Sequence, residues 1–357
     1  TDRTAFRVGT DLALTPGAVV HRSPVVEVLQ YAPTTETVRR RPVLVIPPPI
    51  GRFYFLDLRP GRSFVEHAVS RGLQVFLISW RNPGPDQAQW DLDTYASEIE
   101  RAVEVVKEVT GSPDIDTLGF CAGGILQTTV LNRQAATGDT SIATASYGVT
   151  LLDFDDRAPL GAFSSPRLLE MAGRGSRRKG VITARSLGAV FSWMRPDDLV
   201  FNYLVSGWLM GEDPPVFDIL AWNADGTNLP ARLHQQFLDV FRTNALCHPG
   251  TLTVLGSPVD LSTITLPTFV TGGTTDHLTP WTGCYRTTTE LGGPSTFVLS
   301  NAGHIASLVN PPGNPKASYY EGGPAGAEPQ DWLAGARQQQ GSWWDAWASW
   351  EWERSGD

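Results

Sequence analysis

The sequence predicts an α/β fold in which a mostly parallel central sheet is flanked by helices. Two short apolar runs, residues 43–46 (VLVI) and 75–78 (VFLI), end in turns, as strands buried on both faces do. Between residues 93 and 110, apolar side chains recur at the spacing of one helix face, and Gly111 is placed to end that helix. The chain has 357 residues, 41% of them apolar, which is enough to bury a large core around such a sheet.

The remaining elements follow in order along the chain. Further strands are expected at residues 116–120, 146–152, 268–272 and 296–300. Residues 155–255 interrupt the alternation with long aromatic stretches of helical character, and we interpret them as a cap inserted over the carboxyl edge of the sheet. Residues 1–154 and 256–357 then form the two parts of the core. Near the end of the chain, three tryptophans at helical spacing are predicted to pack in the core: Trp343, Trp347 and Trp350.

Composition excludes several classes of function. The net charge is −9 and no long basic tract is present, so a nucleic-acid partner is not expected. Three cysteines without a CxxC pair argue against a disulfide framework and a cysteine-rich zinc site, and fit a reducing cytoplasm. No apolar run approaches the roughly 18 residues of a membrane span, and no secretory signal opens the chain. The chain begins at Thr1 without a methionine, so an upstream region is expected to be absent from it.

The hexapeptide GFCAGG, residues 119–124, joins a predicted strand to a predicted helix. It has the form of the Gly-x-Ser-x-Gly turn that exposes a nucleophilic serine, with Cys121 in place of the serine. Glycines at 119, 123 and 124 remove the side chains that would collide in so sharp a turn. A thiol there lies at a helix N-terminus, where the backbone favours a thiolate. A small structural cysteine in a tight turn is the alternative interpretation.

Backbone N–H groups for an oxyanion hole can also be nominated. The N–H of Ala122, directly after the nucleophile, is one expected donor. A second usually comes from the loop after an early strand. In that loop residues 47–49 are prolines and have no N–H, so Ile50 or Gly51 is the first candidate.

Partners for the cysteine are expected after two late strands, in the order nucleophile, acid, base. Asp276 follows the predicted strand 268–272, and His304 follows the strand 296–300. Asp153 is a rival acid because it also follows a strand, but Asp276 is preferred because it immediately precedes the strand leading to His304. His277 adjoins the acid and is a candidate substrate contact.

Several long motifs resemble one known family over almost the whole chain, namely LGFCAGG, MRPDDLVFNYLVSGWLMG, FDILAWNADGTNLP, DHLTPW and GHIASLVNPPGNPKA. That family is the polyhydroxyalkanoate (PHA) synthases. The segments GTLTVLGSPVDLSTITL and GSWWDAWASWEWERSG are most similar to class II, which polymerises medium-chain monomers.

The resemblance implies an α/β-hydrolase fold with a mobile cap and a catalytic Cys, His and Asp, which fall on Cys121, His304 and Asp276. It implies polymerisation of 3-hydroxyacyl-coenzyme A with no cofactor and no metal, in a homodimer at the surface of cytoplasmic PHA granules. One departure concerns the oxyanion loop, because this chain has Gly51 and Arg52 where the family usually has Asn-Lys.

In that reaction His304 acts as a base towards the thiol and later towards hydroxyl groups, and Asp276 either orients His304 or helps to activate the 3-hydroxyl group. Arg195 and Trp222 are candidate contacts of the substrate or of coenzyme A. The cap would exclude water through its aromatic side chains, which are Trp193, Phe201, Trp208, Phe217 and Trp222.

Two questions remain open at this stage. The basic segment GRGSRRKG (residues 173–180) could meet coenzyme A phosphates, but a solvated flexible loop is favoured. A thioesterase or polyester hydrolase of the same fold is the nearest alternative function. A granule-coat protein is a further alternative, although it predicts alanine-rich amphipathic helices and no nucleophile turn.

Overall fold

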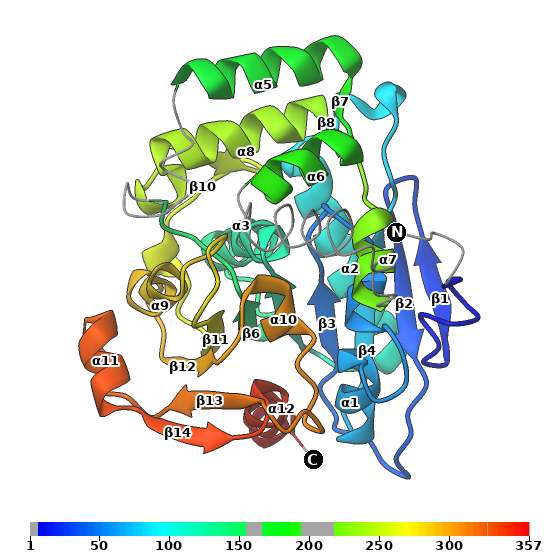
Figure 1. Ribbon diagram of the computed structural model, residues 1–357, viewed down its shortest axis with the longest axis vertical. Helices are drawn as coiled ribbons and strands as arrows, with labels where there is room; N and C mark the ends of the chain where they lie inside the picture. The colour runs from blue at the N-terminus through cyan, green and yellow to red at the C-terminus, as the bar shows by residue number, and fades with distance from the viewer. Residues whose placement is uncertain (1–5, 155–165, 194–217, 327, 357) are drawn as a thin grey trace, which may run out of the picture.

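The computed structural model describes residues 6–154, 166–193, 218–326 and 328–356 (Figure 1). Within these residues, ten strands form one sheet in the order β1-β2-β4-β3-β5-β6-β11-β12-β13-β14. Those strands are β1 (Gly17–Arg22), β2 (Val26–Tyr31), β3 (Val43–Ile46), β4 (Val75–Trp80), β5 (Ile115–Phe120), β6 (Ile142–Gly148), β11 (Thr268–Gly273), β12 (Ser295–Ser300), β13 (Ser318–Glu321) and β14 (Arg337–Gln340). Two short strand pairs lie outside that sheet, β7 (Val181–Ile182) with β8 (Leu229–Pro230) and β9 (Thr253–Val254) with β10 (Ser257–Pro258).

The helices fill the connections between these strands. They are α1 (Phe64–Ser70), α2 (Leu92–Thr110), α3 (Ala122–Thr137), α5 (Pro166–Lys179), α6 (Ala184–Trp193), α7 (Asp218–Ala224), α8 (Ala231–Thr243), α9 (Trp281–Glu290), α10 (His304–Leu308), α11 (Pro329–Gly335) and α12 (Trp343–Arg354). Helix α2 ends as predicted, because Gly111 takes a left-handed conformation that an L-residue rarely adopts.

The predicted α/β architecture is confirmed. Strands β4, β3, β5, β6, β11 and β12 run parallel to one another, and the outer strands β1, β2, β13 and β14 pair antiparallel with their neighbours. These four outer strands were not predicted from the sequence. None of the four is buried along its whole length as β3 is, and β13 and β14 carry mostly polar side chains, so they lack the continuous buried apolar run of a central strand.

Alternate residues of the central strands face two separate core clusters. Leu44 and Ile46 of β3 join the cluster that contains side chains of α2 and α3, whereas Val43 and Val45 join the cluster that contains those of α1 and α12. The run is apolar throughout because helices cover both faces of the sheet. The tryptophans of α12 pack in the second cluster, as predicted: Trp343, Trp347 and Trp350.

One predicted strand was misplaced. The expected strand 146–152 is β6, which begins earlier, at Ile142, and ends at Gly148. Val149 has a φ of 44°, a left-handed conformation that interrupts the pleat, although its N–H still bonds to Thr271 O at 2.9 Å. The polar Thr144 hid the first half of the strand from the apolar pattern.

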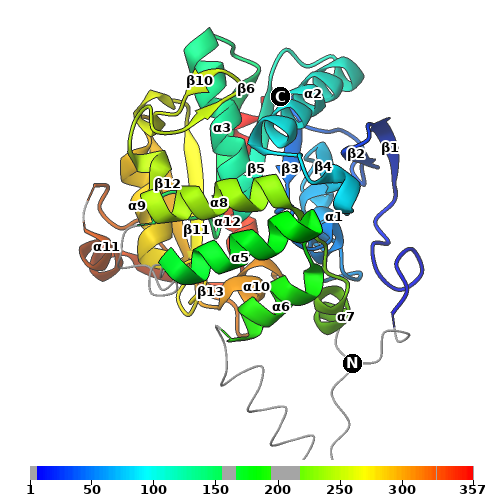
Figure 2. The same cartoon turned by 90° about the horizontal axis from the view of Figure 1, so that it is seen from above.

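Helices α5, α6, α7 and α8 come between β6 and β11, which are neighbours in the sheet. The N–H groups of Arg232 and Leu233, at the start of α8, bond to Ala88 O and Trp90 O in the loop beyond β4. These helices therefore lie over the carboxyl edge of the parallel strands. Figure 2, viewed from above, shows α5, α6 and α8 lying across that edge.

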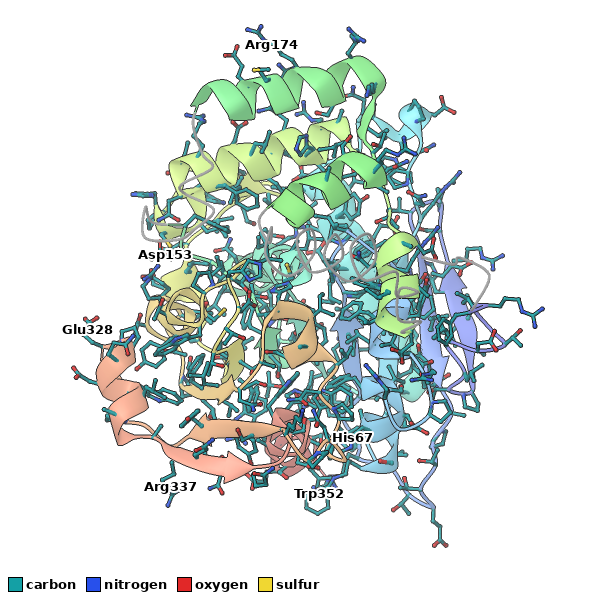
Figure 3. The ribbon with its side chains drawn as sticks, in the orientation of Figure 1. His67, Asp153, Arg174, Glu328, Arg337 and Trp352 are labelled. Atoms are coloured by element: carbon teal, nitrogen blue, oxygen red, sulfur yellow. The ribbon has the colours of Figure 1, made fainter. Side chains whose placement is uncertain are left out.

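The segment 173–180 is not the loop that we expected, because most of it forms the second half of α5. A Cβ at Gly173 would lie 2.6 Å from Gln235 Oε1, so α5 and α8 are in contact at this point. The buried Ser176 Oγ lies 2.9 Å from His234 Nδ1 on α8. Packing against α8 thus favours a helix in spite of two glycines. The basic side chains remain exposed, and Arg174 points outward from the molecule in Figure 3.

Candidate active site

Cys121 forms the junction between β5 and α3. Its backbone has φ 50° and ψ −122°, a strained conformation for a residue with a side chain. The turn is stabilised on both sides, because Cys121 N donates to Gly148 O at 2.9 Å and Thr150 Oγ1 donates to Cys121 O at 3.1 Å. The half-buried cysteine is therefore held at the carboxyl edge of the sheet, at the first turn of a helix.

The three glycines of the turn are each required by a close contact. A Cβ at Gly119 would lie 2.6 Å from Gly124 Cα, and one at Gly124 would lie 2.3 Å from Thr150 Oγ1. A Cβ at Gly123 would lie 2.2 Å from Ile46 O, at the end of β3. The start of α3 therefore packs directly against the proline loop that follows β3.

Asp276 and His304 form a hydrogen-bonded pair beyond β11 and β12. His304 Nδ1 lies 2.7 Å from Asp276 Oδ2, and both side chains are buried. Because an ionised carboxylate only accepts hydrogen bonds, His304 carries its proton on Nδ1. The other oxygen of the carboxylate, Oδ1, accepts from the N–H groups of Leu278 and Thr279, both at 2.9 Å. The acid is thus fixed by its own loop.

Electrostatics link this pair to Cys121. Burial on its own would lower the pKa of His304, but the Asp276 carboxylate and a hydrogen bond to the Cys121 side chain raise that pKa to about 10. Burial likewise opposes ionisation of Asp276, yet the neighbouring His304 keeps the pKa of Asp276 below its ordinary value. Since Nδ1 is bonded to Asp276, Nε2 is the ring nitrogen available to the thiol. The structure therefore brings together Cys121, His304 and Asp276.

The nominated oxyanion donors have different surroundings. The N–H of Ala122 belongs to the first turn of α3, so it has no partner within the helix. The N–H of Gly51 donates to Thr227 Oγ1 at 2.8 Å, whereas the N–H of Ile50 has no acceptor within the part of the chain that the structure describes. Ile50 is therefore the better candidate of the two in this conformation.

The rival acid Asp153 lies elsewhere. Its carboxylate pairs with Arg286 Nε of α9 at 2.7 Å and accepts from Asn244 Nδ2 at 2.8 Å. Asn244 Oδ1 in turn accepts from Phe154 N at 2.9 Å. Asp153 thus links the residue that follows α8 to α9.

The other nominated contacts are only partly placed. Trp222 on α7 is half-buried and donates from Nε1 to Arg52 O at 2.7 Å, so it covers the oxyanion loop. His277 is half-buried, directly after the acid. Arg195 lies outside the described residues, as do three of the five cap aromatics, Phe201, Trp208 and Phe217.

Three threonines near the site were missed by the sequence analysis. Thr279 Oγ1 donates to Asp276 Oδ2 at 2.7 Å, Thr150 supports the turn, and Thr227 holds the oxyanion loop. A lone threonine carries no recognisable spacing, although Thr279 lies within the DHLTPW motif that nominated Asp276.

The described residues contain no group of three or more His, Cys, Asp or Glu side chains that could hold a metal ion. None of the helices among them has the length and hydropathy needed to cross a membrane.

Comparison with known proteins places this site in context. Residues 57–311 match the family model of the alpha/beta hydrolase fold, and residues 1–68 match that of the N-terminus of poly-beta-hydroxybutyrate polymerase. A solved putative lipase from Sulfolobus solfataricus superposes with a TM-score of 0.53 at 17% identity, over 82% of this chain and 87% of the lipase, so the likeness concerns the fold alone.

Two curated relatives are similar over nearly the whole chain. Identity is 44% with poly(3-hydroxyalkanoate) polymerase 2 of Ectopseudomonas oleovorans, over 99% of this chain and 64% of the relative. It is 41% with the poly(3-hydroxyalkanoate) polymerase subunit PhaC of Cupriavidus necator, over 98% of this chain and 61% of the relative. The chain therefore spans less than two thirds of the length of these relatives.

Proposed function

We propose, from the premise that this chain belongs to the α/β-hydrolase family and is a homologue of the poly(3-hydroxyalkanoate) polymerases, that it carries the catalytic part of such a polymerase. One observation carries the proposal. The nucleophile turn holds a cysteine, and the buried His304–Asp276 pair contacts that cysteine in a chain 44% identical to a polymerase. The reaction is acyl transfer from 3-hydroxyacyl-coenzyme A to a growing polyester.

The first step acylates the enzyme. His304 Nε2 takes the thiol proton, and the Cys121 thiolate attacks the thioester carbonyl to form a tetrahedral oxyanion. Collapse of the oxyanion expels coenzyme A as a thiolate, which receives the proton from His304. Cys121 then carries the 3-hydroxyacyl group. Coenzyme A enters and leaves as part of the substrate, so no bound cofactor is proposed.

The second step lengthens the chain. The 3-hydroxyl group of one acyl unit attacks the thioester carbonyl of another, and His304 accepts the hydroxyl proton. The new oxygen ester forms as a carbon–sulfur bond breaks. Asp276 fixes the tautomer of His304 in this scheme, and direct activation of the hydroxyl by Asp276 is the alternative role.

This scheme explains why the turn carries sulfur. Attack by Cys121 exchanges one thioester for another at little net change in free energy, so the acyl group stays activated. A serine would form an oxygen ester that resembles the linkage in the polymer, and the driving force for the next transfer would be lost.

Residues 155–255 form a cap over the site in this proposal. Water must be excluded because it would hydrolyse the acyl-enzyme, and the described part of the segment already covers the oxyanion loop through Trp222. Arg195 and His277 remain candidate contacts for coenzyme A or the acyl chain. The cap must open to admit coenzyme A and to release polymer.

The resemblance extends the proposal to a homodimer that works in the cytoplasm, at the surface of polymer granules, on medium-chain monomers. Gel filtration, fractionation of granules and a panel of four- to twelve-carbon 3-hydroxyacyl thioesters test these three points.

A thioesterase or polyester hydrolase would use the same three side chains with water as the second nucleophile. The deciding experiment incubates the protein with 3-hydroxyacyl-coenzyme A and measures both polymer and free 3-hydroxy acid. Polymer formed in step with coenzyme A release supports the polymerase. Free acid alone would reject it in favour of the hydrolase.

A further inference from the structure

Thr227 lies between α7 and β8, far from the proline loop in sequence, yet its side chain bonds twice to that loop. The hydroxyl accepts from Gly51 N at 2.8 Å and donates to Pro49 O at 3.1 Å. Only 3% of Thr227 is exposed, so water cannot easily replace these bonds. One buried hydroxyl therefore spans the end of the loop.

Neighbouring contacts hold the same loop to the same segment. Trp222 Nε1 donates to Arg52 O at 2.7 Å, and the carboxylate of Asp225 accepts from Tyr54 Oη at 2.9 Å. Gly51 has a φ of 90°, and a Cβ there would lie 2.8 Å from the Trp222 ring. The segment 222–227 thus fixes the path of the loop beside the first turn of α3.

The bond to Thr227 also decides which N–H remains available. Residues 47–49 have none, and the N–H of Gly51 is taken by Thr227. Ile50 then carries the only N–H of the five residues 47–51 that has no acceptor among the described residues. The loop is also close to the nucleophile turn, because a Cβ on Gly123 would lie 2.7 Å from Pro47 O.

We propose that Thr227 is a positioning residue for acyl transfer: it binds the N–H of Gly51 and the carbonyl of Pro49, and so presents the N–H of Ile50 to the oxyanion. The inference rests on the proposed function only in requiring Cys121 to attack a carbonyl group. The carbon–sulfur bond forms, the carbonyl electron pair moves to oxygen, and the N–H groups of Ile50 and Ala122 stabilise that charge. The charge returns as the leaving group departs.

The experiment compares two reagents that modify Cys121 by different chemistry. p-Nitrophenyl butyrate acylates the thiol through a tetrahedral oxyanion and releases p-nitrophenolate. Iodoacetamide alkylates the thiol by displacement of iodide and forms no oxyanion. Both rates are measured by mass spectrometry of the Cys121 peptide, so a loss of folding or of thiolate slows both reactions, whereas loss of the oxyanion hole slows only the first.

Two matched pairs of side chains isolate the hydroxyl group. The first pair is the wild type and Thr227→Val, whose side chains have the same shape but differ in the hydroxyl group. The second pair is Thr227→Ser and Thr227→Ala, which differ only by the hydroxyl oxygen. Thr243→Val, on the exposed end of α8, controls for the general effect of the substitution. If Thr227→Val fails to fold, the serine and alanine variants still test the hydroxyl.

Thr227→Val and Thr227→Ala are expected to lower the rate of butyrylation by about 10- to 100-fold, as a misplaced oxyanion donor does, with alkylation changed less than about twofold. Thr227→Ser is expected to keep most of the rate. Equal losses with both reagents would overturn the proposal, and so would faster butyrylation, which would identify Gly51 as the donor. The protein could also form no polymer and still show butyrylation that depends on the Thr227 hydroxyl. That result would support the role of Thr227 and reject the polymerase function.

Discussion

His304 donates its Nδ1–H to Asp276 Oδ2 across 2.7 Å, while the same ring is hydrogen-bonded to the side chain of Cys121. The imidazole therefore lies between a buried anion and a nucleophilic sulfur. A positive charge on the ring is stabilised from both sides, which suits a base that must hold a proton while an acyl group is transferred.

Asp276→Asn is predicted to lower the pKa of His304 from about 10 towards the ordinary histidine value, because the opposing charge is lost while the burial that lowers the pKa remains. The amide of asparagine can also donate a hydrogen bond to Nδ1, which would place the ring proton on Nε2, the nitrogen that faces the thiol. The rate of acylation should fall by roughly 10²- to 10⁴-fold. The pH titration of ¹⁵N-labelled histidine in nuclear magnetic resonance spectra measures the shift.

Asp153→Asn is the matched control for that substitution. It breaks the ion pair with Arg286 but leaves the bond between His304 and Asp276 in place, so the unfolding free energy should fall while the rate of acylation stays within about threefold. A large loss of rate in this variant would restore Asp153 as the acid.

Cys121→Ser is predicted to keep the fold and to lose polymerisation by about 10³-fold or more, because the activated thioester is replaced by an ester. The unfolding free energy should change by less than about 1 kcal/mol, since the side chain is half-buried and close in size. Coenzyme A release and circular dichroism are the measurements. A variant that makes polymer at a near-normal rate would contradict the covalent thiol mechanism.

Gly123→Ala is predicted to cost more than about 2 kcal/mol of unfolding free energy, because its Cβ would lie 2.2 Å from the backbone oxygen of Ile46. Neither backbone segment can move away without displacing the nucleophile turn. Gly175→Ala on α5 is the control, since a Cβ there meets nothing within 4 Å, and it should stabilise the protein by up to about 1 kcal/mol. Urea unfolding of both variants gives the comparison.

The buried carboxyl groups of Asp116 on β5 and Glu351 on α12 are predicted to make stability depend on pH. Burial raises the pKa of Asp116 to about 6, and burial together with the charge of Asp116 raises the pKa of Glu351. The folded state binds a proton that the unfolded state releases near pH 4. The contribution to stability is therefore fully present below about pH 4 and is lost as the pH rises through about 6 and above.

Glu351→Gln keeps the size and hydrogen-bonding capacity of that side chain but removes one titrating group. The decrease in unfolding free energy between pH 5 and pH 8 should become smaller by about 1 to 3 kcal/mol. Glu104→Gln, an exposed carboxylate on α2, should leave the decrease unchanged. Urea unfolding at pH 5 and pH 8 measures this decrease. An identical decrease in the wild type, Glu351→Gln and Glu104→Gln would show that the Asp116–Glu351 pair does not titrate as described.

Local sequence patterns were enough to predict the central strands, although β6 was misplaced by four residues, and the turn at Cys121. The short connections after β11 and β12 also nominated Asp276 and His304, which lie together in the structure because the carboxyl ends of parallel strands share one edge. The strands follow from the local periodicity of apolar residues. The relative positions of Asp276 and His304 follow from the order of the strands in the sheet.

Other features could not be predicted because they depend on contacts distant in sequence. Thr227 bonds to Gly51 of the proline loop, which lies 176 residues earlier in the chain, and no spacing rule connects the two residues. The helical state of the segment 173–180 likewise depends on α8, whose Gln235 and His234 follow more than 50 residues later. The outer strands are only partly buried, so their apolar pattern is weaker than that of the central strands.

Residues 154 and 244, which flank helices α5 to α8, meet where Asn244 bonds to Phe154 N and to Asp153. The core sheet is closed beneath this junction, because β6 pairs directly with β11. A change in the length of the chain between these two residues therefore need not alter the register of β6 and β11. Chimaeras joined at residues 154 and 244 would place helices α5 to α8 of one relative on the sheet and the Cys121 turn of another, and so would test whether the two parts act independently.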